Sequence, residues 1–320
     1  MGAYGLQSHI WNNQLKSLLL LAGFPVLLAL LLLGLTIGYV GFTEPVRSMD
    51  EARSLVMDRY FRVLPFAFFG ACAWFFIAWV AHQRIIAASV GSRGLQRGDA
   101  PEIYNLLENL CISRGIPMPT LSIIETPQMN AFASGISDKN YAITLTRGLI
   151  DRLDRDELEA VLAHELTHIR NQDVRLLIVA VIFVGIFSFV GELIFNGLFR
   201  SGVRIGGHTR SRRGDSRGGG ILIIVAIVVI VVAYLLAIVI RFALSQKREY
   251  LADAGAVDLT RNADAMVSAL EKISGRSEID APDDVRQMMV DNPVRFFGVF
   301  ATHPPIEKRV LALREYAGAA

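Results

Sequence analysis

The chain has 320 residues, enough for one large or two small domains with a sizeable core. Hydrophobic residues make up 52% of it and charged residues only 19%, a balance that is unusual for a soluble protein and indicates a membrane protein. The net charge of +2 is too small to argue for a nucleic-acid partner, and two cysteines give no disulfide framework. We interpret both Cys72 and Cys111 as buried thiols.

The first 90 residues predict a pair of membrane helices. The apolar run 18–40 is long enough to cross a bilayer, which takes about 20 residues, and it starts too late for a typical signal peptide. A second run, 63–81, is rich in Phe and Trp and would return across the bilayer. Residues 42–62 between them carry four arginines and four acidic residues. The alternative, two helices buried in a protein core, fits runs of this length poorly.

A polar linker at 91–99 leads into sequence of the soluble type. Residues 101–114 are amphipathic, with a proline in the first turn and Gly115 after the end, which is typical of a helix. Alternating patterns predict three strands, at 121–126, 129–135 and 141–146, the last two joined by a turn at 137–140. We expect a small sheet. A strand at its edge could bind an extended peptide by adding it as a further strand, or the strands could serve only as core.

The strongest chemical signal is His164-Glu165-x-x-His168. Residues four apart share one face of a helix, so both imidazoles can bind the same metal ion. Glu165 is placed to act as general base on a metal-bound water. Asp154 followed by Glu157 predicts a capping box at the start of this helix. Its apolar residues form one stripe at helical spacing: Leu158, Val161, Leu162, Leu166 and Ile169. The alternative is an amphipathic helix with two ordinary histidines.

Two more apolar runs follow, at 176–199 and 221–244, each long enough to span a bilayer. The segment 200–220 between them is rich in Gly and Ser, contains six arginines, and reads as a loop. The two runs either both cross the membrane or form a re-entrant hairpin. We expect the metal-binding helices to continue these membrane helices, which would keep the metal within about 12 Å of the bilayer edge.

A catalytic zinc site takes three protein ligands, so one ligand is still needed. Glu249 is the leading candidate, because Glu249 and Asp253 lie one turn apart in a helical pattern at 245–256. Asp253 would then stand behind Glu249 and orient it. The alternative is a solvated acidic face on a surface helix. Residues 274–301 are irregular, and 302–313 form a final short helix that begins with proline.

Three motifs together resemble a known family: H-E-L-T-H at 164–168, R-E-Y-L-A-D-A-G-A at 248–256 and T-H-P-P-I-E-K-R at 302–309. They are similar to the membrane zinc metalloproteases of the HtpX type, which are related to the CAAX prenyl proteases. The resemblance also takes in the paired N-terminal runs and the N-A-F-A-S-G strand at 130–135. It implies a mostly helical α+β integral membrane protein, with a gluzincin-like zinc protease domain attached to four apolar helices. The seven-span layout of the CAAX enzymes is not found here.

The resemblance also implies roles for single residues. It implies one Zn²⁺ per chain with three ligands: His164, His168 and Glu249. Glu165 would be the general base, Asp253 would pair with Arg309, and His303 would lie near the substrate carbonyl and handle its charge or a proton. From its place on the edge strand, Asn130 is either a substrate-binding residue or a turn residue. Asp173 reads as a plain polar residue at the helix end rather than as a brace.

The chain therefore divides into four predicted segments: a transmembrane hairpin (1–90), the first part of the zinc protease domain (91–175), a second transmembrane or re-entrant hairpin (176–244) and the second part of that domain (245–320). We expect a zinc endopeptidase in the cell membrane, with several spans and a cytoplasmic zinc domain. Its substrates would be membrane or misfolded proteins near the bilayer surface, in protein quality control and stress response. The alternative is a membrane adaptor that retains a zinc-binding fold without activity; the intact Glu165 argues against it.

Overall fold

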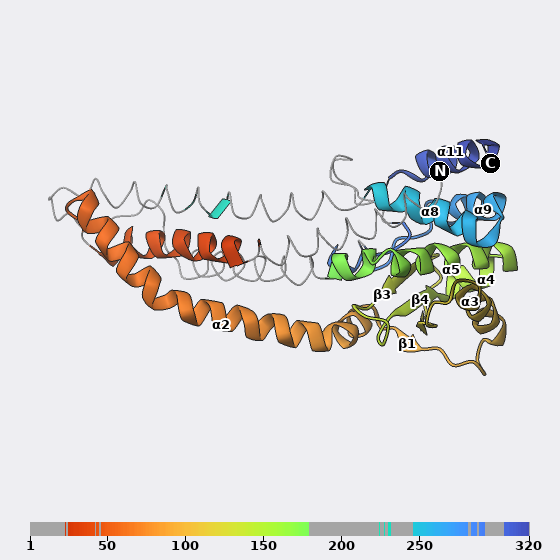
Figure 1. Ribbon diagram of the computed structural model, residues 1–320, viewed down its shortest axis with the longest axis horizontal. Helices are drawn as coiled ribbons and strands as arrows, with labels where there is room; N and C mark the ends of the chain where they lie inside the picture. Colours follow the sequence, from red (N-terminus) through yellow and green to blue (C-terminus); the bar gives the residue numbers. More distant parts are fainter. Residues whose placement is uncertain are drawn as a thin grey trace. The chain divides into compact units, whose positions relative to one another are not determined.

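The computed structural model describes residues 23, 25–41, 43–44, 46–178, 246–280, 283–286, 288–291 and 304–319, together with positions 224, 227, 230 and 231 (Figure 1). Its described residues fall into two compact units. One takes those within 80–179 and 242–320, and the other those within 18–79 and 180–241. His303, the segment 200–220 and most of the third and fourth apolar runs lie outside the described residues.

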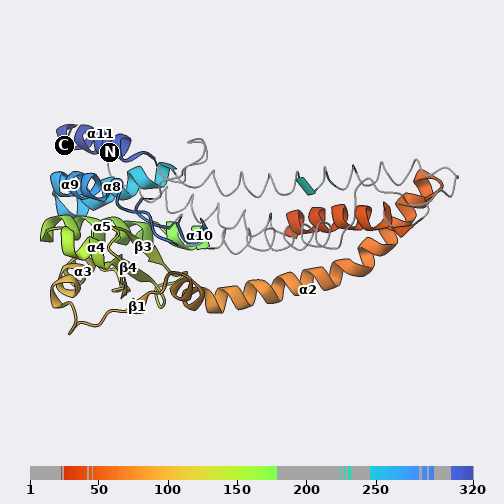
Figure 2. The same ribbon diagram turned by 180° about the vertical axis from the view of Figure 1, so that it is seen from behind.

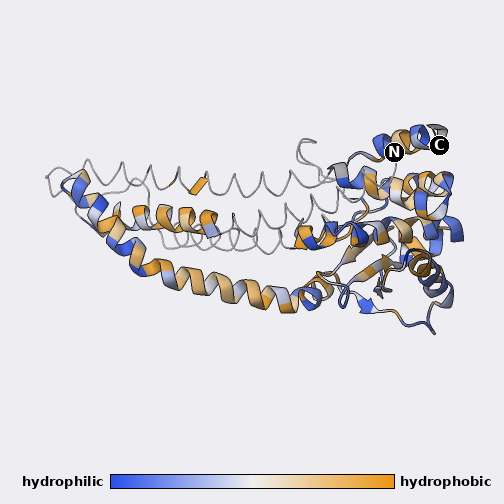
Figure 3. Cartoon of the chain, viewed as in Figure 1, coloured by the Kyte–Doolittle hydropathy of each residue, from blue (hydrophilic) through white to orange (hydrophobic). Residues whose placement is uncertain are grey.

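The second unit contains the helix Pro25–Gly41 and most of α2 (Met49–Val90). Among the described helices, α2 is the one long and apolar enough to cross a membrane, and Figure 3 shows its apolar middle. The helix Pro25–Gly41 is apolar but shorter. Four small side chains, contributed by both helices and their connection, form a buried cluster: Val40, Val46, Ala52 and Val56. A helix therefore lies in each of the first two apolar runs, of which the second is long enough to span, and the transmembrane hairpin stays a prediction.

Two details of this region differ from the sequence analysis. α2 begins well before the apolar run 63–81, because Ser48 and Glu51 form its start: the Glu51 N–H donates to Ser48 Oγ at 3.2 Å. Cys72 is exposed on α2, so the prediction of a buried thiol is wrong at this position, where the apolar side chains point outward rather than into a protein core. Cys111 is buried as predicted.

The first unit is built on a four-stranded sheet with the order β1-β2-β4-β3. Its strands are β1 (Arg93–Gly94), β2 (Thr120–Ile124), β3 (Ala131–Ser134) and β4 (Ala142–Thr146). β2 and β4 are parallel, whereas β1 and β3 pair antiparallel with their neighbours. The three predicted strands are confirmed to within a few residues at their ends. β1 falls in the predicted linker 91–99, because a two-residue strand leaves no alternating pattern to detect.

Helices cover the sheet in layers. They are α3 (Pro101–Arg114), α4 (Arg147–Arg152), α5 (Arg155–Arg170), α8 (Gln246–Thr260), α9 (Ala263–Ile273), α10 (Asp283–Arg286) and α11 (Ile306–Ala319). α5 packs against β3 and β4 on one side and against α8 and α9 on the other, and α11 covers α8 and α9 (Figure 2). α5 is thus the central helix of this unit.

The start of α5 is fixed by the predicted capping box. The Glu157 N–H donates to Asp154 Oδ1 at 2.9 Å, and the Asp154 N–H donates to Glu157 Oε2 at 2.8 Å. The same Glu157 carboxylate is buried and accepts hydrogen bonds from Ser268 and Lys272 of α9. The cap therefore also ties α5 to α9. The predicted apolar stripe of α5 is buried along its whole length.

The end of α5 departs from the expectation. α5 ends at Arg170, Gln172 adopts a positive φ of 59°, and a new helical stretch occupies 173–178. A positive φ is uncommon for a residue with a side chain, and it interrupts the helix here. The prediction that the metal-binding helix continues directly into the third apolar run is therefore wrong. Asp173 follows this break in the helix and contacts His168, as described below.

A close approach between α5 and α8 gives a first testable prediction. A Cβ atom at Gly255 of α8 would lie 2.4 Å from Thr167 Cγ2 of α5. Thr167 cannot easily turn away, because its Oγ1 donates to the Ala163 carbonyl at 2.8 Å. We expect Gly255→Ala to lower the free energy of unfolding by about 1–3 kcal/mol and to weaken zinc retention, since the two helices carry all three predicted ligands.

Thr167→Ala in the same chain should restore much of the loss, because it removes the colliding atoms. Thermal unfolding and zinc content of the purified single and double variants provide the measurement. A Gly255→Ala variant as stable as the unmodified chain would show that the contact between the helices is looser than described.

Candidate metal centre

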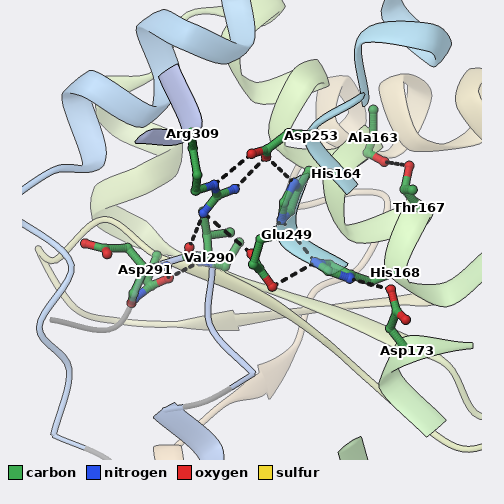
Figure 4. Close-up of polar contacts among 12 residues, drawn as sticks. Ala163, His164, Thr167, His168, Asp173, Glu249, Asp253, Val290, Asp291 and Arg309 are labelled. Atoms are coloured by element: carbon green, nitrogen blue, oxygen red, sulfur yellow. Dashed lines mark hydrogen bonds and ion pairs between the residues drawn. The ribbon is translucent and has the colours of Figure 1, made fainter. Parts of the chain in front are cut away.

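Three metal-binding side chains meet where α5 crosses α8 (Figure 4). His164 Nε2 and His168 Nε2 are 3.1 Å apart. Glu249 Oε2 lies 3.7 Å from His164 Nε2, and Glu249 Oε1 lies 3.6 Å from His168 Nε2. His164 and Glu249 are buried and His168 is nearly so, which excludes a solvated acidic face as the explanation for Glu249.

This donor set fits zinc in both chemistry and spacing. Two imidazoles and one carboxylate form a known type of catalytic zinc site that leaves a position open for water. With one ligand atom taken from each residue, the three atoms lie within 4.8 Å of one another, so they can all reach the same ion. Burial lowers the pKa of His168, but the charges of Glu249 and Asp173 outweigh burial and raise that pKa to about 9. The same negative field favours a metal cation at this position.

Each histidine is oriented by a carboxylate on its other ring nitrogen. Asp173 Oδ2 lies 3.1 Å from His168 Nδ1, and Asp253 Oδ1 lies 3.0 Å from His164 Nδ1. Because a carboxylate only accepts hydrogen bonds, Asp173 favours the proton on His168 Nδ1 and leaves Nε2 of that ring to bind a metal. Asp253 contacts His164 Nδ1 as an ion pair, and the His164 Nε2 faces His168 Nε2 at the same place. Asp173 is therefore a brace, and its interpretation as a plain helix-end residue is wrong. Asp253 stands behind His164 rather than behind Glu249.

Arg309 of α11 contacts both carboxylates of α8 at the site, Asp253 and Glu249. Its Nε and Nη2 donate to the two Asp253 oxygens at 2.8 and 2.6 Å, in a bidentate pair. Its Nη1 donates to the Val290 carbonyl at 2.8 Å and lies 3.6 Å from Glu249 Oε2. Arg309 is fully buried, and Asp253 has only 2% of its surface exposed. Burial alone would raise the pKa of the Asp253 carboxyl, but the positive charge and hydrogen bonds of the adjacent Arg309 guanidinium outweigh burial and lower that pKa.

Glu165 lies beside the donors without joining them. It is buried, and its Oε2 has no hydrogen-bond partner among the residues that the structure describes. Burial raises the pKa of Glu165 to about 7, and a hydrogen bond from the Ala133 backbone opposes the rise only in part. A carboxylate with a pKa near neutrality and an oxygen available for a proton is suited to general acid–base work.

A pocket opens onto this arrangement. It is lined by Glu165, His168 and Glu249 on the metal side, and elsewhere by Ala133, Arg248 and Met288 among others. Ala133 belongs to β3, which lies at the edge of the sheet, as expected for a strand that could bind a peptide. Sequence reasoning passed over Arg248 and Met288. Arg248 directly precedes the ligand Glu249, and only its burial in three dimensions distinguishes it from a surface arginine.

The edge of β3 is partly covered by the chain itself. The Val290 N–H donates to the Ala131 carbonyl at 2.9 Å, and Phe132 pairs with Met289 in an isolated bridge. Asn130 is fully buried, and its side-chain amide donates to the carbonyls of Ser277 and Asp291 at 2.9 Å each. Asn130 thus anchors the covering segment, and a direct contact between Asn130 and a substrate stays a prediction.

Comparison with known proteins agrees with the geometry. Residues 98–317 match the model of peptidase family M48. The chain is 40% identical to "Protease HtpX homolog" of Bacteroides fragilis over 98% of this chain and 99% of that protein. It is 33% identical to the protein of the same name from Limosilactobacillus reuteri over 97% of this chain and 99% of that protein.

Among solved structures, S. mikatae Ste24p has a TM-score of 0.45 and 19% identity, covering 79% of this chain and 58% of that chain. The family assignment rests on the sequence matches and on the His164, His168 and Glu249 site. The chain belongs to peptidase family M48, as one of its HtpX homologues, and is a zinc metallopeptidase that acts on proteins.

Proposed function

We propose that this metallopeptidase is membrane-embedded and cleaves internal peptide bonds of membrane or misfolded proteins close to the bilayer surface, in protein quality control. The observation that carries the catalytic part is the position of Glu165. Its buried carboxylate lies next to three metal donors and lines the same pocket as two of them, with one oxygen that no described residue engages. A site built only to bind a metal would not need this group.

The side chains divide the work of peptide hydrolysis. Zinc, when bound, supplies Lewis acidity that makes water more acidic and polarises a carbonyl. Glu165 accepts a proton from the attacking water at Oε2 and passes it on to the leaving amine. The Ala133 backbone N–H holds the Glu165 carboxylate in place during both transfers. His303 is proposed, from the family resemblance, to donate to the oxygen of the carbonyl under attack.

The membrane part of the proposal is supported by α2 and by the apolar runs around the site. α2 can cross a membrane by length and composition. His168 precedes the third apolar run by eight residues and Glu249 follows the fourth by five, so the site lies close in sequence to both. Because His168 and Glu249 meet at one place, the chain must cross the bilayer an even number of times between them.

The catalytic proposal is tested by metal removal. Full-length protein purified in detergent is expected to cleave casein, to lose this activity after dialysis against a zinc chelator, and to regain it when one equivalent of zinc is returned. Restoration by zinc separates loss of the metal from loss of the fold. Zinc-loaded protein that leaves casein intact, or cleavage that a chelator does not touch, would contradict the proposal.

The orientation is tested separately by reporter fusions in cells. We expect a reporter at the C-terminus to lie in the cytoplasm, and a reporter at Arg210 to lie on the opposite side if both later runs span. Both reporters in the cytoplasm would select the re-entrant form. A C-terminal reporter outside the cytoplasm would contradict a cytoplasmic zinc domain.

A further inference from the structure

Arg248 is a second buried arginine at the metal centre, and it differs from Arg309. It lies in the first turn of α8, directly before the ligand Glu249, and only 8% of its surface is exposed. Its side chain lines the same pocket as Glu165 and His168. The established chemistry of the site assigns it no role, since it neither binds the metal nor handles a proton.

The hydrogen bonds of the two arginines show the difference. All three guanidinium nitrogens of Arg309 donate to the chain itself. Arg248 donates from Nη1 to the Asp173 carbonyl at 3.3 Å, while its buried Nε has no partner among the described residues. It forms no ion pair with any carboxylate in the described part of the chain. A guanidinium carries five N–H donors, and a buried charged donor left without an acceptor is costly.

The hydrogen bond to the Asp173 carbonyl sets the direction of the Arg248 side chain. Asp173 is itself held in place, because its carboxylate braces His168. The guanidinium is therefore oriented by the same turn that orients a metal ligand, its Nε has no partner among the described residues, and its side chain lines the pocket next to the metal donors. Groups held in this way before the ligand arrives lower the cost of binding it.

We propose that Arg248 is a substrate-binding residue, whose guanidinium donates to a main-chain carbonyl oxygen of the peptide beside the bond to be cleaved. The proposal rests on the proposed endopeptidase function and deepens it. A neutral carbonyl is favoured over a carboxylate as the acceptor. The pocket already holds the carboxylates of Glu165, Asp173 and Glu249, and a further negative charge would be repelled by them.

The test measures peptide binding without turnover. Full-length Glu165→Gln protein, loaded with zinc in detergent, is titrated with a fluorescent casein-derived peptide that is N-acetylated, C-amidated and free of Asp and Glu. Adding Arg248→Met should weaken binding about tenfold to hundredfold. Arg248→Lys keeps the charge but loses the planar set of donors, so its peptide affinity should lie between those of the parent chain and the Arg248→Met chain. The matched control is Arg276→Met, an exposed arginine that does not line the pocket.

Zinc content should stay near one per chain in all these variants. In chains with Glu165 intact, Arg248→Lys should raise KM for the same peptide more than it lowers kcat. A purely structural role would lower zinc content and thermal stability together with affinity.

Three results would overturn the assignment. The first is equal affinity for the peptide in the Arg248→Met and Arg276→Met chains, and the second is loss of zinc from both Arg248 variants. The third is a loss of affinity that is seen only with a second version of the peptide, made with a free C-terminal carboxylate. Casein cleavage by the unmodified chain keeps this test distinct from the proposed function. If the Arg248→Lys chain cleaves normally with an unchanged KM, only the role of Arg248 is refuted. If the unmodified chain does not cleave casein and the Glu165→Gln chain does not bind the peptide, the proposed function is refuted as well.

Discussion

Replacing Glu165 by Gln is expected to lower the rate of casein cleavage by at least about 10²–10⁴-fold while zinc content stays near one per chain. The amide has nearly the shape of the carboxylate but cannot accept and return a proton. Glu165 is not one of the three metal donors, so its loss should leave metal binding in place. Cleavage rate and zinc content are measured on the same preparation.

The control for this experiment is Glu249→Gln, which changes the same side chain at a proposed ligand. We expect that variant to lose zinc as well as activity, which would separate a catalytic glutamate from a metal-binding one. Full proteolysis by the Glu165→Gln chain would show that another group moves the proton.

Replacing Arg309 by Ala is expected to destabilise the protein by about 3–5 kcal/mol and to release zinc. Arg309 and Asp253 are both buried, and removal of the guanidinium leaves the charges of Asp253 and Glu249 without their counter-charge. Asp253 faces His164, so its displacement would also disturb a metal ligand. Unfolding in detergent and zinc content would both be measured.

Lys308 provides the matched control, because it is the neighbouring cation on α11 and is exposed. Lys308→Ala should change the free energy of unfolding by no more than about 1 kcal/mol and leave zinc in place. Arg309→Lys should fall between the two, since it keeps the charge but loses the bidentate geometry. Equal and mild effects of Arg309→Ala and Lys308→Ala would show that the buried pair does not hold the site together.

The helices that carry the metal ligands could be predicted from short stretches of sequence. Asp154 and Glu157 predicted the start of α5, and the spacing of His164 and His168 placed both imidazoles on one face, because capping and helical periodicity are properties of a few neighbouring residues. The repeat of four between Glu249 and Asp253 likewise identified the face of α8 that meets α5. These features needed no knowledge of the tertiary structure.

Features that depend on tertiary contacts were missed or misplaced. Asp173 contacts His168 from the far side of a break in the helix at Gln172, whose positive φ no pattern in the sequence indicates. Asp253 braces His164 rather than Glu249, since the crossing of α5 over α8 decides which ligand it faces. Arg248 carries the same sequence signal as any arginine on a helix, and its burial becomes visible only once the pocket is formed.

The central claim is that His164, His168 and Glu249 hold one zinc ion next to Glu165. X-ray absorption at the zinc edge, recorded on the zinc-loaded full-length Glu165→Gln protein, tests it most directly. The structure predicts a spectrum with two imidazole nitrogens and the remaining donors oxygen, and loss of bound zinc in the corresponding Glu249→Ala chain. A sulfur donor, a single imidazole, or zinc retained unchanged after Glu249→Ala would contradict this account of the metal centre.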